Sequence, residues 1–218
     1  MIKRALLSGL LFLCIQTMHG QVVEKKIVPG DGRQNWFGSA VSIFGDYVIV
    51  GARLDDDLVL NGGAAYIFHK EGMDWIQQQK IYASDVEQDL RFGRSVAMTA
   101  DRAIVGAHKD GLLSGTGVAY LFSHDTTGWT EEDRIQASDG MPGDRFGLSV
   151  GISGDYAVIG AFGLNDSTGA AYVFSYDGAS WVEQASPWRF WLGACGWIRD
   201  STVWHSEQII PSIALCMG

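Results

Sequence analysis

One pattern recurs three times at nearly constant spacing, and this periodicity limits the fold more than any other feature of the chain. Each copy holds, in the same order, a Phe-Gly pair, a Gly-Ala pair, an Ala-Tyr-x-Phe stretch and a tryptophan. The Phe-Gly pairs step by 55 and then 54 residues. The copies begin at Phe37, Phe92 and Phe146, and their tryptophans are Trp75, Trp129 and Trp181. A period near 50 residues is typical of an array of supersecondary units, each of which must pack on a neighbour to bury its apolar face.

The second copy predicts four short strands separated by turns. The second of these strands is almost entirely apolar and β-branched, which favours a buried position, whereas the fourth alternates with polar residues and is expected at an edge. Four short antiparallel strands in about 54 residues describe one blade of a β-propeller. The predicted strands are 92–98, 103–107, 118–122 and 129–137.

The repeats divide the chain into an all-β array, an incomplete β-propeller of about three four-stranded antiparallel blades. Ahead of the first blade, Lys26-Ile27 precedes Phe37 at the spacing of a fourth strand, which predicts an orphan outer strand over 22–28. The predicted boundaries are 21–36 for the orphan strand segment, 37–83 for blade 1, 84–137 for blade 2 and 138–184 for blade 3.

The N-terminal segment 1–20 has the pattern of a secretory signal peptide. Lys3 and Arg4 form a basic start, and the apolar stretch 5–15 is too short to span a bilayer. Cleavage after Gly20 would leave a secreted or cell-surface protein without a membrane span; a simple membrane anchor is the alternative. The formal charge of -9, without basic patches or lysine runs, argues against nucleic acid and anionic membranes as partners.

The stretch from Ala137 to Phe174 carries most of the motifs at once: ASDG, GDRFGLSV, ISGDYAVIGA and GAAYVF. With the triplicate landmarks, it resembles the FG-GAP repeat of integrin-type β-propellers, over residues 22–184, and most closely a bacterial secreted subtype. The resemblance implies a cell-surface binding or adhesion module with a protein or surface glycan as its ligand. It also implies calcium as a cofactor of some blades, and a few members of the family are attached to hydrolases.

The calcium loop of that family resembles an EF-hand loop, with acidic residues at alternate positions followed by glycine. The chain has no Asp-x-Asp-x-Asp-Gly stretch. The nearest candidates are Asp55, Asp56 and Asp57, of which Asp55 and Asp57 are the predicted metal ligands. A solvated acidic loop without an ion is the alternative.

The loop between the second and third strands differs most in length among the copies. In repeat arrays such insertions gather on one face, which is often the binding face. The histidines share no repeat position and no metal-ligand spacing, so we expect them at the surface. The residues predicted to contact a ligand are Arg53, Asp55, Asp56, Asp57, His108, Lys109, Asp110, Asn165 and Asp166.

The segment Gly147–Gly151 matches the Gly-x-Ser-x-Gly pattern of serine hydrolases. That pattern requires a strand, a sharp elbow and a helix, whereas Ser149 aligns with Ser95 inside a predicted strand. We therefore expect no catalytic residue and no enzymatic activity in the repeats.

The repeat stops at Ala185, and residues 185–218 hold four of the eight tryptophans but only two acidic residues. An out-of-frame translation of a longer protein is our hypothesis for this segment, and a true capping or secretion tail is the alternative. Three blades leave sheet edges uncovered, which predicts self-association through them. The sequence thus leaves three functions open: a binding module, a non-functional truncation, or the propeller part of a secreted hydrolase.

Overall fold

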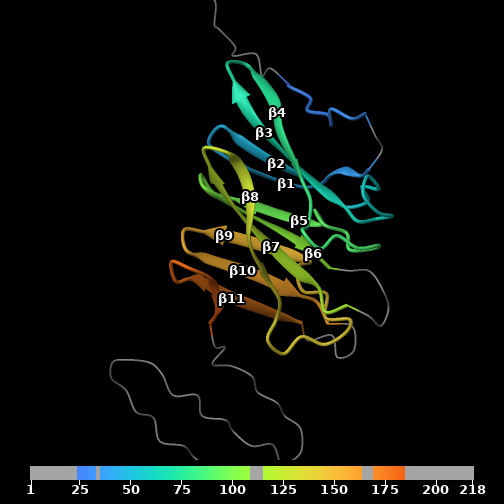
Figure 1. Cartoon of the computed structure of the whole chain (residues 1–218), viewed down its shortest axis with the longest axis vertical. Helices are drawn as coiled ribbons and strands as arrows, with labels where there is room; N and C mark the ends of the chain where they lie inside the picture. The colour runs from blue at the N-terminus through green and yellow to red at the C-terminus, as the bar shows by residue number, and fades with distance from the viewer. Residues whose placement is uncertain (1–23, 33–34, 109–114, 164–168, 185–218) are drawn as a thin grey trace, which may run out of the picture. The chain divides into compact units, whose positions relative to one another are not determined.

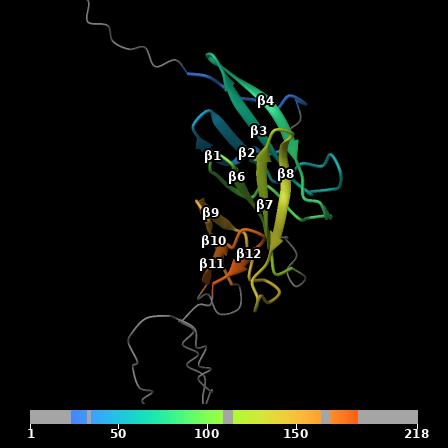
Figure 2. The same ribbon diagram turned by 60° about the vertical axis from the view of Figure 1, so that its left-hand side comes forward.

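The computed structural model describes residues 24–32, 35–108, 115–163 and 169–184. Over these residues the chain forms twelve strands in three four-stranded sheets, in the orders β1-β2-β3-β4, β5-β6-β7-β8 and β12-β11-β10-β9. Every pairing of neighbouring strands is antiparallel. Figure 1 shows the first two sheets complete and β9 to β11 of the third, and Figure 2 shows β12 as well. The three predicted blades are confirmed.

Each blade is a simple up-and-down meander, so chain order and strand order are the same. Blade 1 consists of β1 (Phe37–Phe44), β2 (Tyr47–Ala52), β3 (Ala64–Glu71) and β4 (Asp74–Ile81). Blade 2 consists of β5 (Ser95–Met98), β6 (Arg102–Ala107), β7 (Val118–Asp125) and β8 (Gly128–Ile135). Blade 3 consists of β9 (Ser149–Ser153), β10 (Tyr156–Ala161), β11 (Ala170–Tyr176) and β12 (Trp181–Glu183).

The repeated aromatic residues form the interior of each blade. The phenylalanine of each Phe-Gly pair meets the tyrosine of the third strand edge to face, with ring centroids 5.3 Å apart for Phe37–Tyr66 and 5.4 Å apart for Phe92–Tyr120. Phe146 and Tyr172 repeat this geometry at 5.4 Å in blade 3. Such pairs contribute beyond their buried area because the edge of one ring meets the face of the other.

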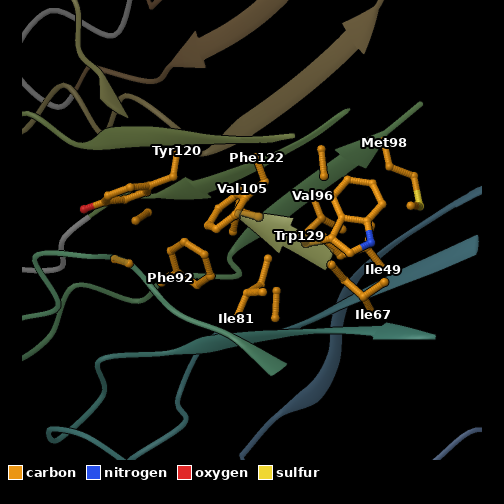
Figure 3. Packing of buried hydrophobic residues seen from close by; sticks show 14 of the residues in the cluster. Ile49, Ile67, Ile81, Phe92, Val96, Met98, Val105, Tyr120, Phe122 and Trp129 are labelled. Carbon is orange, nitrogen blue, oxygen red and sulfur yellow. The ribbon is translucent and has the colours of Figure 1, made fainter. Parts of the chain in front are cut away.

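Neighbouring blades share a continuous apolar core. Figure 3 shows Ile49 and Ile67 of blade 1 beside Val96, Met98 and Trp129 of blade 2, and all five belong to one cluster of buried side chains. A second cluster joins blades 2 and 3 in the same manner. The blades are thus nearest-neighbour units, each of which buries its apolar faces on the next one.

Glycine has two roles in the blades. Gly45 and Gly154 lie in hairpin turns with φ of 55° and 54°, a region that glycine adopts without the strain of a side chain. At the Gly-Ala pairs, a Cβ on Gly51 would lie 2.0 Å from the carbonyl oxygen of Gly93 in the next blade. The close approach of two backbones therefore requires glycine there.

The orphan strand predicted over 22–28 is wrong for residues 24–28, which adopt no strand; residues 22 and 23 lie outside the described part of the chain. This segment is held through side chains. Lys25 pairs with Asp74, the amide of Gly30 donates to Oε1 of Gln77 at 2.9 Å, and Ile27 packs on the core of blade 1. A strand requires a ladder of backbone hydrogen bonds, and none of these contacts contributes to one.

The predicted signal peptide 1–20 and the segment 185–218 also lie outside the described residues, so both interpretations stay predictions. Within the part of the chain that the structure describes, no helix is long and apolar enough to cross a membrane.

Candidate functional site

An aspartate from the loop ahead of each blade accepts a hydrogen bond from the buried tyrosine of the third strand. The hydroxyls of Tyr66, Tyr120 and Tyr172 donate to Asp31, Asp85 and Asp139 at 2.8, 2.6 and 2.8 Å. The contact places a carboxylate on the polar end of a side chain whose ring lies in the core. Each tyrosine therefore satisfies its hydroxyl while its ring remains buried.

A basic residue of the fourth strand completes this arrangement in blades 1 and 2. The Nζ atom of Lys80 lies 2.9 Å from Asp31, and the Nε atom of Arg134 lies 2.8 Å from Asp85. Lys80 and Arg134 are one repeat apart, as are Asp31 and Asp85. The recurring unit is thus an aspartate between a tyrosine hydroxyl and a cation.

Blade 1 adds two further carboxylates to this unit, and it is here that two predicted ligand residues meet. Asp55 lies 2.8 Å from Nζ of Lys80, and Asp57 also pairs with that ammonium group. The loop between β2 and β3 therefore turns Asp55 and Asp57 inward, toward β4. The side chain of Asp55 is fully buried and that of Lys80 is 13% exposed.

Neighbouring groups satisfy the carboxylate of Asp55 almost completely. Its Oδ2 accepts from Nδ2 of Asn35 at 2.7 Å and from the hydroxyl of Tyr66 at 3.0 Å. Its Oδ1 accepts from the backbone amide of Asp57 at 3.0 Å. A buried carboxylate is tolerated only with such partners, so this set of contacts has a structural role.

The electrostatics of the cluster favour a permanently charged lysine. Burial lowers the pKa of Lys80, but hydrogen bonds to Asp31, Asp55 and Asp57 outweigh it and raise the pKa above its ordinary value. For Tyr66, burial and the nearby carboxylates raise the pKa, although Lys80 opposes them. At neutral pH the cluster holds one ammonium group among three aspartates and a neutral tyrosine.

The resemblance to a calcium-binding family makes this cluster the place to test for a metal. Carboxylate oxygens of Asp31, Asp55 and Asp57 all lie within 4.8 Å of one another, and Ca²⁺ prefers such oxygen ligands. However, Nζ of Lys80 contacts all three side chains. The ammonium group provides the cation that the carboxylates require, and a metal ion would have to displace it, so the residues as arranged do not fit calcium.

The remaining predicted ligand residues are divided by the fold. Asp56 is exposed and accepts a hydrogen bond from the amide of Asn61 at 2.6 Å, and Arg53 stacks over the ring of Trp36 at 4.6 Å. His108 is buried, so the expected surface position is wrong for this histidine, because it continues directly from the buried strand β6. The other four residues lie outside the described part: Lys109, Asp110, Asn165 and Asp166.

Leu58 and Leu60 are exposed members of the same predicted ligand loop, 53–61, although the prediction did not single them out. Each exposes just over half of its surface, at 56% and 55%. With Asp56, they are the exposed positions of residues 55–60 and alternate with the less exposed Asp55, Asp57 and Val59. A loop that buries Asp55, pairs Asp57 with a lysine and exposes its leucines differs from a solvated acidic loop, and it offers apolar area to a partner.

Sequence reasoning also missed Asp31 and Lys80. The signal was available, because an aspartate recurs at the spacing of the repeat in Asp31, Asp85 and Asp139, and a basic residue recurs in Lys80 and Arg134. Neither recurrence belongs to the Phe-Gly and Gly-Ala landmarks. The contact itself becomes visible only when the fourth strand lies beside the loop from the preceding repeat.

Three stacked antiparallel meanders with a repeated aromatic core define a β-propeller-type repeat protein. The model of the FG-GAP repeat matches the chain three times, at residues 22–68, 75–122 and 129–174, which together exceed half of its length. The chain therefore belongs to the FG-GAP repeat family. A comparison with curated proteins gave no match.

Proposed function

We propose that this chain is a secreted or cell-surface binding module, with a protein or surface glycan as its ligand and without catalytic activity. The observation that carries the proposal is the loop between β2 and β3 of blade 1, which exposes two leucines beside an acidic side chain. The side chains of Asp55 and Asp57 in this loop pair with Lys80 of β4, so the loop is fixed to the sheet. A supported loop with an apolar tip can bind without the entropic cost of first becoming ordered.

Ser149 supports the absence of catalysis. It begins β9, so the Gly-x-Ser-x-Gly match lies on a strand as predicted, and the helix that a hydrolase elbow requires does not follow it among the described residues. The sequence is consistent with a module that recognises a surface rather than one that transforms a substrate.

The test is binding of the full chain to arrays of immobilised extracellular matrix proteins and glycans. We expect a subset of array positions to bind the wild type and to lose binding with the double variant Leu58→Ser, Leu60→Ser. The matched control is Met73→Ser, a 79% exposed apolar residue in the β3–β4 turn at the opposite end of the strands, which should bind as the wild type does. Equal binding by the double variant, or no binding by the wild type, would overturn the proposal.

A further inference from the structure

The interface between consecutive blades is built twice from the same contacts. The backbone of each Phe-Gly pair enters the preceding blade, where Gly63 forms a parallel bridge with Phe92 and Gly117 forms one with Phe146. The carbonyl of the glycine in each pair accepts a hydrogen bond from a serine hydroxyl of the preceding blade. The distances are 3.0 Å from Ser39 to Gly93 and 2.8 Å from Ser95 to Gly147. We call the first strand with its Phe-Gly pair the leading face of a blade, and the surface that receives it the trailing face.

The trailing face of blade 3 has the same construction but nothing covers it in the described structure. Val158 is 45% exposed, whereas its counterparts Ile49 and Ile104 are completely buried by the next blade. Val173 is 39% exposed, whereas its counterpart Ile67 is completely buried. Apolar strand residues that are buried in two blades are therefore open to solvent in the third.

A cavity marks the place where a Phe-Gly pair would enter this trailing face. It has a volume of about 430 Å³, and its lining includes Ser149, Gly160, Gly169 and Ala171. A Cβ on Gly160 would meet only Ser149 of its own strand pair, whereas a Cβ on Gly106 would lie 2.0 Å from a carbonyl of the next blade. Blade 3 thus keeps the glycine that close approach requires, although no described backbone approaches it.

The leading face of blade 1 is open in the complementary way. Val41 and Ile43 are 67% and 64% exposed, whereas their counterparts Val96 and Met98 are buried against blade 1. Gly38 has a φ of 90°, close to the 87° of Gly93, yet its Cβ position has no neighbour within 4 Å. Gly38 thus already has the positive φ that Gly93 and Gly147 have in the docked blades 2 and 3.

We propose that the trailing face of blade 3 binds the leading face of blade 1 of a second copy of this chain. One molecule carries both halves of an interface whose form is seen twice inside it, so no new type of contact is required. Tyr47 gives a further indication, because its ring meets Trp129 of the next blade at 6.1 Å. Its counterpart in blade 3, Tyr156, is 60% exposed. In the proposed dimer, Trp75 of the second copy would contact Tyr156 as Trp129 contacts Tyr47.

Two copies joined at both faces close a ring of six blades. Known propellers have about four to eight blades, so six falls within the range and nine, from three copies, does not. Closure also removes the uncovered sheet faces that would otherwise favour open-ended association.

The test is the molar mass of the full chain in solution, measured by sedimentation over a range of concentrations. We expect a dimer for the wild type and a monomer for Val158→Glu and for Ile43→Lys, which block one face each. Both residues are exposed within a single copy, so thermal unfolding of the isolated copy should not change. The matched control is Ile76→Glu. Ile76 is also a 45% exposed strand residue, but it stays exposed even where blade 2 covers blade 1. This variant should therefore remain dimeric.

Mixing the two blocked variants distinguishes this interface from other dimers. Ile43→Lys keeps an intact trailing face and Val158→Glu keeps an intact leading face, so a 1:1 heterodimer should form. A dimer that pairs identical faces would not be restored by mixing. A monomeric wild type, a dimer that resists both variants, or a mixture that stays monomeric would each overturn the proposal. Loss of ligand binding would not bear on it, because the β2–β3 loop lies outside both faces.

Discussion

Replacing Lys80 with methionine should destabilise the protein by about 3–5 kcal/mol, the cost of removing one partner from a buried ion pair. The structure supports this large loss of stability rather than the small losses that follow from removing a surface ion pair. The Nζ atom of Lys80 lies 2.8 Å from Asp55 and 2.9 Å from Asp31, and the side chain of Asp55 is fully buried. Methionine keeps the apolar stem of the side chain but removes its charge. Because Asp55 is buried, water cannot take the place of the lost ammonium group.

Arg134 provides the matched control because it is the counterpart of Lys80 in blade 2. Its ion pair with Asp85 is more open, with side chains that are 38% and 47% exposed. Exposed pairs contribute about 0–1 kcal/mol, so Arg134→Met should cost far less than Lys80→Met. Urea unfolding followed by tryptophan fluorescence gives both free energies. Equal losses, or a loss below about 1 kcal/mol for Lys80→Met, would refute the assignment of the ammonium group as the cation of the cluster.

The same variant tests the calcium interpretation. With Lys80 present, calcium should leave the melting temperature unchanged, because the ammonium group holds the position between Asp31, Asp55 and Asp57. In Lys80→Met the three carboxylates lack a cation, so calcium should raise the melting temperature as any ligand of the folded state does. A calcium-dependent rise in the wild type would show that the lysine yields its place to the ion.

Three further outcomes follow from single features of the blades. Gly147→Ala should cost more than about 3 kcal/mol or prevent folding, because its Cβ would lie 2.3 Å from a backbone oxygen. Gly154→Ala, at a φ of 54° with nothing within 4 Å of the added Cβ, should cost about 1–2 kcal/mol in urea unfolding. Stability should fall as the pH rises above 10.0. Burial raises the pKa of Tyr66 and Tyr120 in the folded state, so the unfolded chain loses those protons first. Tyr120→Phe should make this decline less steep when melting is measured as a function of pH. Gln79→Ala should cost about 1–3 kcal/mol by thermal unfolding, because its amide bonds both backbone groups of the next blade's tryptophan, at 2.9 and 2.7 Å.

Periodicity predicted the blades because the repeated residues act locally. Gly106 and Ala119, from two of the repeated motifs, are direct partners in one sheet, and the alternation of a strand determines which side chains share a face. The glycine of a Gly-Ala pair was also predictable, since close backbone approach leaves a mark on residue type. These features need no knowledge of how distant segments meet.

The cluster around Lys80 was not predictable in the same way. It joins Asp31 from the loop ahead of blade 1, Asp55 from the β2–β3 loop and a lysine from β4, and only the register of the fourth strand brings them together. The orphan strand failed for a related reason. Residue types at strand spacing do not supply a hydrogen-bonding neighbour, and segment 24–28 has side-chain partners instead.

The family repeat and the structural blade are out of phase by one strand, but contacts between successive repeats make the ends of the array matter in either description. The match at 75–122 begins with β4 of blade 1 and ends in β7 of blade 2, so each repeat crosses a blade boundary. The bridges of Gly63 with Phe92 and of Gly117 with Phe146 still join one match to the next, and the terminal faces are the places where a repeat lacks its neighbour. Burying a valine or isoleucine side chain contributes about 1.5–3 kcal/mol. Val158 and Ile43 are 45% and 64% exposed in a single copy and so lack part of that contribution, and head-to-tail closure would recover it with the contacts that the chain already makes twice.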